Sequence, residues 1–192
     1  MKKLPVIFDI ETKKKFREVT DHKDLGVSLV GVYDFKTAKY STFLEKELNR
    51  FFKVLEDSSY IIGFNIKSFD VPILQEYYPG KFSDFLVFDI LDDLREKIGK
   101  RYSLNYFAFA TLGKKKAGHG LQAVDFYREG KIEELKKYCL RDVELTKELF
   151  NYGVKHGEIF YLNEMGKVPV LVDWKKYIYD EVKKDTRLTL PF

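Results

Sequence analysis

Cysteine is almost absent from this sequence, because Cys139 is the only one among 192 residues. A single thiol cannot close a disulfide within the chain or build a cysteine-rich zinc site, which excludes a disulfide-stapled secreted scaffold. Charge of one sign is not in large excess either. The 34 lysines and arginines stand against 30 aspartates and glutamates, a net charge of +4. This mildly basic balance permits a nucleic-acid partner but does not by itself indicate one.

Long apolar runs and domain linkers are also missing. No segment reaches the ~20 apolar residues of a transmembrane helix. At the N-terminus, Pro5 and Asp9 interrupt the apolar residues of MKKLPVIFDIET well short of a signal-peptide core. We therefore expect a cytoplasmic protein with no membrane contact. No repeat and no Pro-, Gly- or Ser-rich stretch divides the chain, which predicts a single domain over residues 1–192.

Hydrophobic residues are plentiful, at 45% of the chain, and their spacing predicts strands that alternate with helices. The predicted strands are 4–10, 27–35, 39–43, 59–64 and 85–88, followed by two short C-terminal strands at 159–162 and 168–172. The predicted helices are 45–55, 71–78 with Ser68 as its N-cap, 90–98, 104–111, 121–127 and 132–152. This order favours an α/β fold with a mixed sheet, in which a hairpin forms an antiparallel edge and crossovers form a parallel part.

The first predicted strand carries two acids. Side chains alternate along a strand, so Asp9 and Glu11 face the same side of the sheet. If this strand is central and buried, each carboxylate is penalised by burial and by the charge of the other, and a cation is needed to keep both ionised. The alternative is a strand that ends at Phe8, with both acids solvated in a turn.

Two further acids lie in other segments. Asp70 falls near the start of a predicted helix, where an interaction with the helix dipole is the alternative to a functional role. Asp142 lies on the same face of the longest predicted helix as Tyr138. The alternative there is an exposed acid paired with a lysine or arginine, beside a half-buried tyrosine. If all these carboxylates meet, Mg²⁺ or Mn²⁺ can neutralise them, and a pair of such ions can support phosphodiester cleavage.

The segments that carry these acids resemble a known family. FDIET, GFNIKSFD and YCLRD, in this order, resemble the three motifs of the DEDDy-type 3′–5′ exonucleases of the ribonuclease H-like superfamily. The resemblance spans Asp9 to Asp142 and is strongest to the exonuclease domain of family B DNA polymerases and its stand-alone relatives. It implies a ribonuclease H-like mixed five-stranded sheet flanked by helices, with the short C-terminal strands as additions.

The resemblance also implies roles for individual residues. Asp9 matches the aspartate that bridges two Mg²⁺ or Mn²⁺ ions, and Glu11 and Asp142 match ligands of the ion that holds the attacking water. Asp70 matches the acid that serves the second ion through water, and Tyr138 matches the tyrosine that orients the attacking water. Because a tyrosine phenol has a reference pKa of ~10, we expect hydrogen bonding from it rather than general-base catalysis.

Substrate contacts are expected from two further places. Phe64 and Asn65 lie where such enzymes contact the terminal nucleotide, although Phe64 is equally suited to core packing. The glycine- and lysine-rich stretch ATLGKKKAGHG resembles a substrate-facing loop, with Lys115 and His119 as candidate phosphate contacts. The alternative for that stretch is a surface loop without a role in binding.

The function implied is hydrolysis of phosphodiester bonds at the 3′ end of single-stranded nucleic acid, with DNA favoured over RNA and nucleoside 5′-monophosphates as products. A separate polymerase or repair protein is a candidate partner. Two alternatives remain: a structure-selective endonuclease of the same fold, and a catalytically silent nucleic-acid-binding module. The complete set of acids argues against the silent module, because such modules commonly lose a metal ligand.

Overall fold

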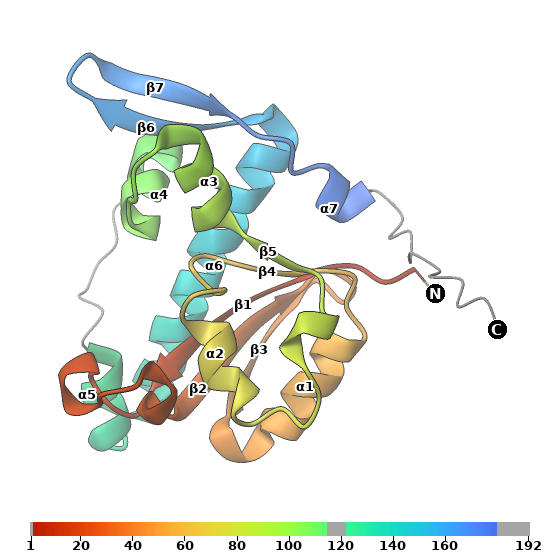
Figure 1. Cartoon of the computed structure of the whole chain (residues 1–192), viewed down its shortest axis with the longest axis vertical. Helices are drawn as coiled ribbons and strands as arrows, with labels where there is room; N and C mark the ends of the chain where they lie inside the picture. Colours follow the sequence, from red (N-terminus) through yellow and green to blue (C-terminus); the bar gives the residue numbers. More distant parts are fainter. Residues whose placement is uncertain (1, 115–121, 180–192) are drawn as a thin grey trace, which may run out of the picture.

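A five-stranded mixed sheet forms the centre of the fold in the computed structural model, which describes residues 2–114 and 122–179 (Figure 1). Its strand order is β3-β2-β1-β4-β5. The strands are β1 (Val6–Thr12), β2 (Val27–Asp34), β3 (Lys39–Leu44), β4 (Ile61–Gly63) and β5 (Val87–Asp89). Neighbours among β1, β2 and β3 are antiparallel, whereas neighbours among β1, β4 and β5 are parallel. The predicted mixed sheet is therefore confirmed.

Helices cover both faces of this sheet. They are α1 (Leu48–Glu56), α2 (Asp70–Gln75), α3 (Ile90–Ile98), α4 (Leu104–Leu112), α5 (Gln122–Arg128), α6 (Ile132–His156) and the short α7 (Lys176–Tyr179). Short 3₁₀ helices lie between these elements, at Phe16–Glu18, His22–Leu25, Glu45–Glu47 and Phe82–Asp84.

The alternation of β1 decides which of its side chains reach which face. Phe8 and Ile10 pack into one apolar cluster with residues of α1 and α2, whereas Ile7 packs into another with residues of α3, α4 and α6. Asp9 and Glu11 share the parity of Ile7, so they face the side of the sheet against which α6 packs. The alternative of a strand that ends at Phe8 is wrong, because β1 continues to Thr12.

Two helix ends differ from the sequence prediction. Ser68 does not cap α2; the residue before that helix is Phe69, and no side chain caps it. Asn65 adopts a left-handed conformation with a φ of 69°, and the Ser68 hydroxyl donates to Asn65 Oδ1 at 2.8 Å instead. α6 runs past its predicted end to His156, until Gly157 takes a left-handed φ of 72° and ends it.

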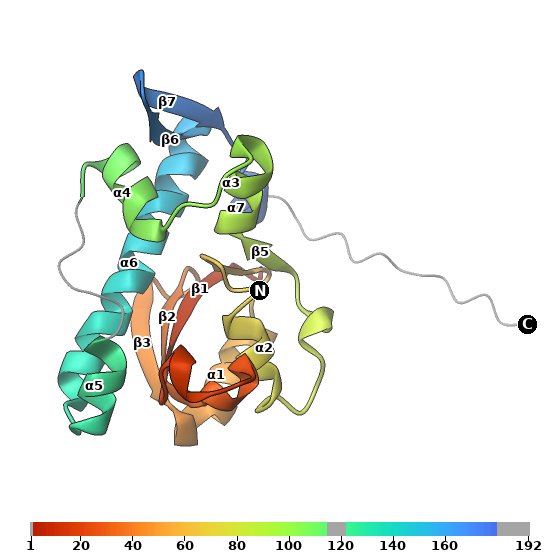
Figure 2. The ribbon, with the colours of Figure 1, turned by 60° about the vertical axis from the view of Figure 1, so that its left-hand side comes forward.

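The C-terminal part forms a hairpin apart from the main sheet. β6 (Glu158–Asn163) and β7 (Gly166–Leu171) pair antiparallel as a two-stranded sheet, which confirms the two predicted C-terminal strands. Figure 2 shows this hairpin at one end of α6, with α5 beside the other end. Trp174 follows the hairpin and packs against Phe88 and Phe150. In the described parts of the chain, no helix is both long and apolar enough to cross a membrane.

Candidate active site

β1 lacks a strand neighbour along part of one edge. β4 pairs with it only at Val6 and Ile7, because β4 is short and the chain turns away after Gly63. Beyond this paired part, the backbone N–H of Ile10 donates to Asp70 Oδ1 at 3.1 Å. Asp70 is the first residue of α2. The Asp70 carboxylate therefore accepts a backbone hydrogen bond that a neighbouring strand would otherwise accept. This bond holds the carboxylate against β1, the middle strand of the sheet.

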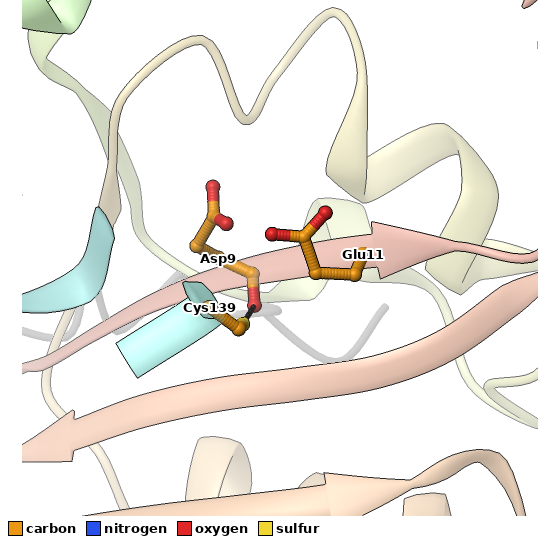
Figure 3. Close-up of side chains that lie close together, drawn as sticks. All are labelled: Asp9, Glu11 and Cys139. Atoms are coloured by element: carbon orange, nitrogen blue, oxygen red, sulfur yellow. Dashed lines mark hydrogen bonds between the residues drawn. The ribbon is translucent and has the colours of Figure 1, made fainter. Parts of the chain in front are cut away.

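Asp9 and Glu11 extend from the same side of β1, as Figure 3 shows. Both are partly buried. One carboxylate oxygen of each and the Sγ of Cys139 all lie within 4.8 Å of one another. Cys139 belongs to α6, and its thiol donates to the backbone oxygen of Asp9 at 3.6 Å. α6 therefore contacts β1 directly at the pair of acids.

α6 also brings Asp142 to this place. Burial raises the pKa of the Cys139 thiol, and the negative charges of Asp9, Glu11 and Asp142 raise it further. The charges of these three carboxylates therefore all affect the Cys139 thiol, although Asp142 is far from Asp9 and Glu11 in the sequence. A thiol that stays protonated is a poor metal ligand, so the carboxylates are the metal-binding groups available here.

One cleft gathers most of the predicted site residues. It has a volume of about 510 Å³, and its acidic lining residues are Asp9, Asp70 and Asp142. Phe64 and Asn65 line it as well. The other lining residues are Phe69, Leu91, Arg101, Tyr102, Ser103 and Leu104. Glu11 joins this group through its proximity to Asp9.

Asp70 is deeply buried, with 3% of its surface exposed. Burial raises its pKa to about 8, and the charge of Asp89 raises it too, whereas the hydrogen bond from the Ile10 N–H opposes the rise. A cation in the cleft would favour the ionised form, because a nearby opposite charge lowers the pKa of a carboxyl group.

Asp89, at the end of β5, supports the site, and the sequence analysis missed it. The residue is 2% exposed, and its carboxylate accepts hydrogen bonds from the backbone N–H groups of Asn65, Lys67 and Leu91 at 2.8–2.9 Å. These bonds tie the loop after β4 to the start of α3, so they hold Asn65 in the wall of the cleft. A signal was present in the sequence, because an acid directly before a predicted helix is a typical N-cap.

Replacing Asp89 by asparagine is expected to lower the free energy of unfolding by about 1.5–3 kcal/mol. Asparagine has an NH₂ group in place of one carboxylate oxygen, and this group cannot accept hydrogen bonds from the backbone N–H groups that now donate to that oxygen. Burial raises the pKa of Asp89, so loss of the charge offsets part of the cost. Urea unfolding would measure the change. Asp92→Asn is the control, since Asp92 is a more exposed acid in the first turn of α3 that pairs with Arg95. Equal effects of the two substitutions would contradict this role of Asp89.

The other predicted site residues differ from the carboxylates in where the structure places them. Tyr138 lies on α6 before Asp142, but it is not among the residues that line the cleft; its ring packs edge-on against Phe126, with the ring centroids 6.4 Å apart. Phe64 packs against Phe107 at 6.2 Å while lining the cleft, so core packing is confirmed and base stacking stays a prediction. The candidate phosphate contacts Lys115 and His119 lie outside the described residues.

The donor set fits a hard divalent cation. Asp9, Glu11, Asp70 and Asp142 offer carboxylate oxygens, which Mg²⁺ and Mn²⁺ prefer as ligands. Burial penalises the ionised form of Asp70, and one carboxylate oxygen of Asp9 lies within 4.8 Å of one of Glu11. A bound cation would relieve the penalty on Asp70 and find further carboxylate ligands beside it, so the residues present suit these metals.

Known proteins show the same fold. A family model described as the RNase_H superfamily matches residues 6–154. No curated protein matches the sequence. The family B DNA polymerase of the hyperthermophilic archaeon Pyrobaculum calidifontis is similar with a TM-score of 0.58 and 19% identity, over 78% of this chain and 25% of the polymerase. The RNase D of Trypanosoma brucei is similar with a TM-score of 0.56 and 16% identity, over 77% of this chain and 56% of that enzyme. This chain therefore spans only part of each of these structures.

Proposed function

The chain belongs to the RNase H superfamily, and from this premise we propose that it is a metal-dependent 3′–5′ exonuclease of the DEDDy type. The observation that carries the proposal is the meeting of Asp9, Asp70 and Asp142, from β1, α2 and α6, in one cleft. Burial of Asp70 in a cleft that also contains Asp9 and Asp142 disfavours its ionised form. A function that uses divalent cations explains why these acids are there.

We assign the four carboxylates to a pair of Mg²⁺ or Mn²⁺ ions. In this proposal Asp9 serves both ions, Glu11 and Asp142 hold one of them, and Asp70 serves the other. When bound, such ions activate water and stabilise the charge that develops on the phosphodiester. The raised pKa of Asp70 supports the assignment, because a cation would recover the free energy that burial of its charge costs.

Other residues of the chain hold the substrate and the water. We assign the terminal nucleotide to Phe64 and Asn65, with base stacking on the ring worth about 1–3 kcal/mol. We assign Tyr138 to orienting the attacking water by a hydrogen bond rather than to general-base catalysis, because phenols have a reference pKa of about 10. The proposed substrate is a single strand with a free 3′ end, DNA rather than RNA, and the products are nucleoside 5′-monophosphates. A separate polymerase or repair protein is the proposed partner.

The test uses 5′-labelled and 3′-labelled oligonucleotides with Mg²⁺ or Mn²⁺. We expect the 5′-labelled strand to shorten stepwise and the 3′-labelled strand to release its label at once as a mononucleotide, with both stopped by EDTA. Matched DNA and RNA strands belong in the same assay, because one structural relative is a DNA polymerase and the other an RNase.

Two controls separate the alternatives. A circular single strand should stay intact, and its cleavage would support the endonuclease instead. Added Mn²⁺ should raise the melting temperature, since a ligand that binds only the folded state stabilises it; a silent module would show no such rise. No shortening with either metal, in protein shown to be folded by circular dichroism, contradicts the exonuclease.

A further inference from the structure

Arg101 lies in the loop between α3 and α4, at the wall of the acidic cleft. The residue is exposed, and it lines the same cleft as Asp9, Asp70 and Asp142. Among the lining residues that fall within 2–114 and 122–179, it is the only cation. A nucleic-acid strand is a polyanion, so a cleft lined by carboxylates needs positive charge near the place where a phosphate binds.

The guanidinium group of Arg101 is held in place by Asn65. Its Nη2 donates to Asn65 Oδ1 at 2.7 Å, and the Ser68 hydroxyl donates to the same oxygen at 2.8 Å. Because a guanidinium group has only donors, the amide oxygen must face it, which fixes the orientation of the Asn65 side chain. Asn65 is itself fixed through its backbone N–H, which donates to Asp89 at 2.8 Å.

This arrangement leaves most of the guanidinium group for another partner. Arginine has five N–H donors in a planar fork, and the bond to Asn65 uses one side of it. No carboxylate in the described parts of the chain forms an ion pair with Arg101; Arg50, Arg95 and Arg128 have acidic partners, whereas Arg17 and Arg141 share this feature but do not line the cleft. A planar fork without an anion suits a phosphate group, which it can bind through paired hydrogen bonds.

We propose that Arg101 binds a backbone phosphate of the substrate strand, next to the nucleotide that Asn65 and Phe64 contact. The inference rests on the proposed function, because it places a nucleic-acid strand in this cleft. It adds a residue that binds substrate directly and that also orients Asn65. Neither the charge of the cleft nor the three acidic motifs specify such a contact.

The experiment measures binding of a 5′-fluorescein-labelled single-stranded oligonucleotide in EDTA over a series of NaCl concentrations. Arg101→Ala should weaken binding about tenfold, the loss expected for one charge-assisted contact. The slope of log affinity against log salt should become shallower by about 0.7, because one phosphate contact is lost from a single strand. Arg101→Lys should restore the slope but only part of the affinity, because lysine lacks the planar fork.

The control is Arg50→Ala, which removes the same charge from α1, where Arg50 pairs with Glu47 and does not line the cleft. A second series carries single uncharged methylphosphonate linkages near the 3′ end. Neutralising one of these linkages should abolish most of the difference between the wild type and Arg101→Ala. A further oligonucleotide ends in a 3′-phosphate, which tests whether Arg101 binds a terminal phosphate instead of a backbone phosphate.

Three results would overturn the proposal: an effect of Arg101→Ala no larger than that of Arg50→Ala, an unchanged salt slope, or a difference that persists with every neutral linkage. If only the strand with a 3′-phosphate distinguishes the two proteins, assignment to a backbone phosphate is wrong. Because binding in EDTA is read separately from strand shortening, a wild-type protein that binds but does not cleave contradicts the proposed function and not the role of Arg101.

Discussion

Asp9→Asn is expected to reduce strand shortening by at least about 10³-fold, because an amide cannot replace the charge of a ligand proposed to serve both ions, and metal-ion stabilisation is worth several kcal/mol. The same substitution should weaken binding of Mn²⁺ to the folded protein, because one of two carboxylates whose oxygens lie within 4.8 Å of each other loses its charge.

The measurements are shortening of a 5′-labelled oligonucleotide and thermal unfolding with and without Mn²⁺. Asp173→Asn is the matched control, since Asp173 is exposed and pairs with Lys176 at 3.8 Å. The Mn²⁺-dependent rise in melting temperature should shrink in Asp9→Asn and persist in Asp173→Asn. Turnover of Asp9→Asn within about tenfold of the wild type, a difference of only ~1.4 kcal/mol, would remove Asp9 from the proposed site.

Trp174→Ala is expected to lower the free energy of unfolding by about 3–5 kcal/mol, the usual cost of removing a large aromatic side chain from a core. Trp174 is 1% exposed, and its ring is nearly parallel to Phe150, with the centroids 5.8 Å apart. Its Nε1 donates to Asp93 at 2.9 Å. These contacts fasten the segment after the hairpin to β5, α3 and α6.

Denaturant unfolding followed by circular dichroism measures this change, because Trp174 is the only tryptophan and its loss removes the tryptophan fluorescence signal. Trp174→Phe, which keeps an aromatic ring but loses the hydrogen bond to Asp93, should cost less. Gly153 offers a sharper control, since a Cβ there would lie 2.3 Å from the Trp174 ring. Gly153→Ala should be destabilising in the wild type and much less so in Trp174→Ala. Additive effects of the two substitutions would show that this contact is not as described.

Local features of the fold were predictable from the sequence because they depend on neighbouring residues. The alternation of a strand puts Asp9 and Glu11 on one face if the strand continues past Phe8, and β1 does continue to Thr12. The bounds of α3 follow from its apolar spacing. Ser68 shows where such signals fail: a serine favours the N-cap, but here the amide of Asn65 competes for its hydroxyl.

The meeting of acids from distant segments in one cleft is not a local property, and the spacing of residues along the sequence did not predict it. Nothing in the positions of Asp9, Asp70 and Asp142 requires them to meet; the likeness of three ordered motifs to an exonuclease family supplied that expectation, and the cleft contains all three. The catalytic roles stay predictions. Arg101 was missed because it lies in an irregular loop, where no periodicity indicates the direction of a side chain.

The burial of Cys139 has a practical consequence for optical work on this molecule. Its thiol is fully buried against β1 and its pKa is raised, so maleimide dyes have no reactive sulfur to find there. Met165, in the turn of the hairpin, is 91% exposed. A cysteine in place of Met165 would carry one fluorophore per molecule without prior removal of the native thiol. Energy transfer between this fluorophore and a dye on an oligonucleotide could then report movement of the oligonucleotide relative to the protein.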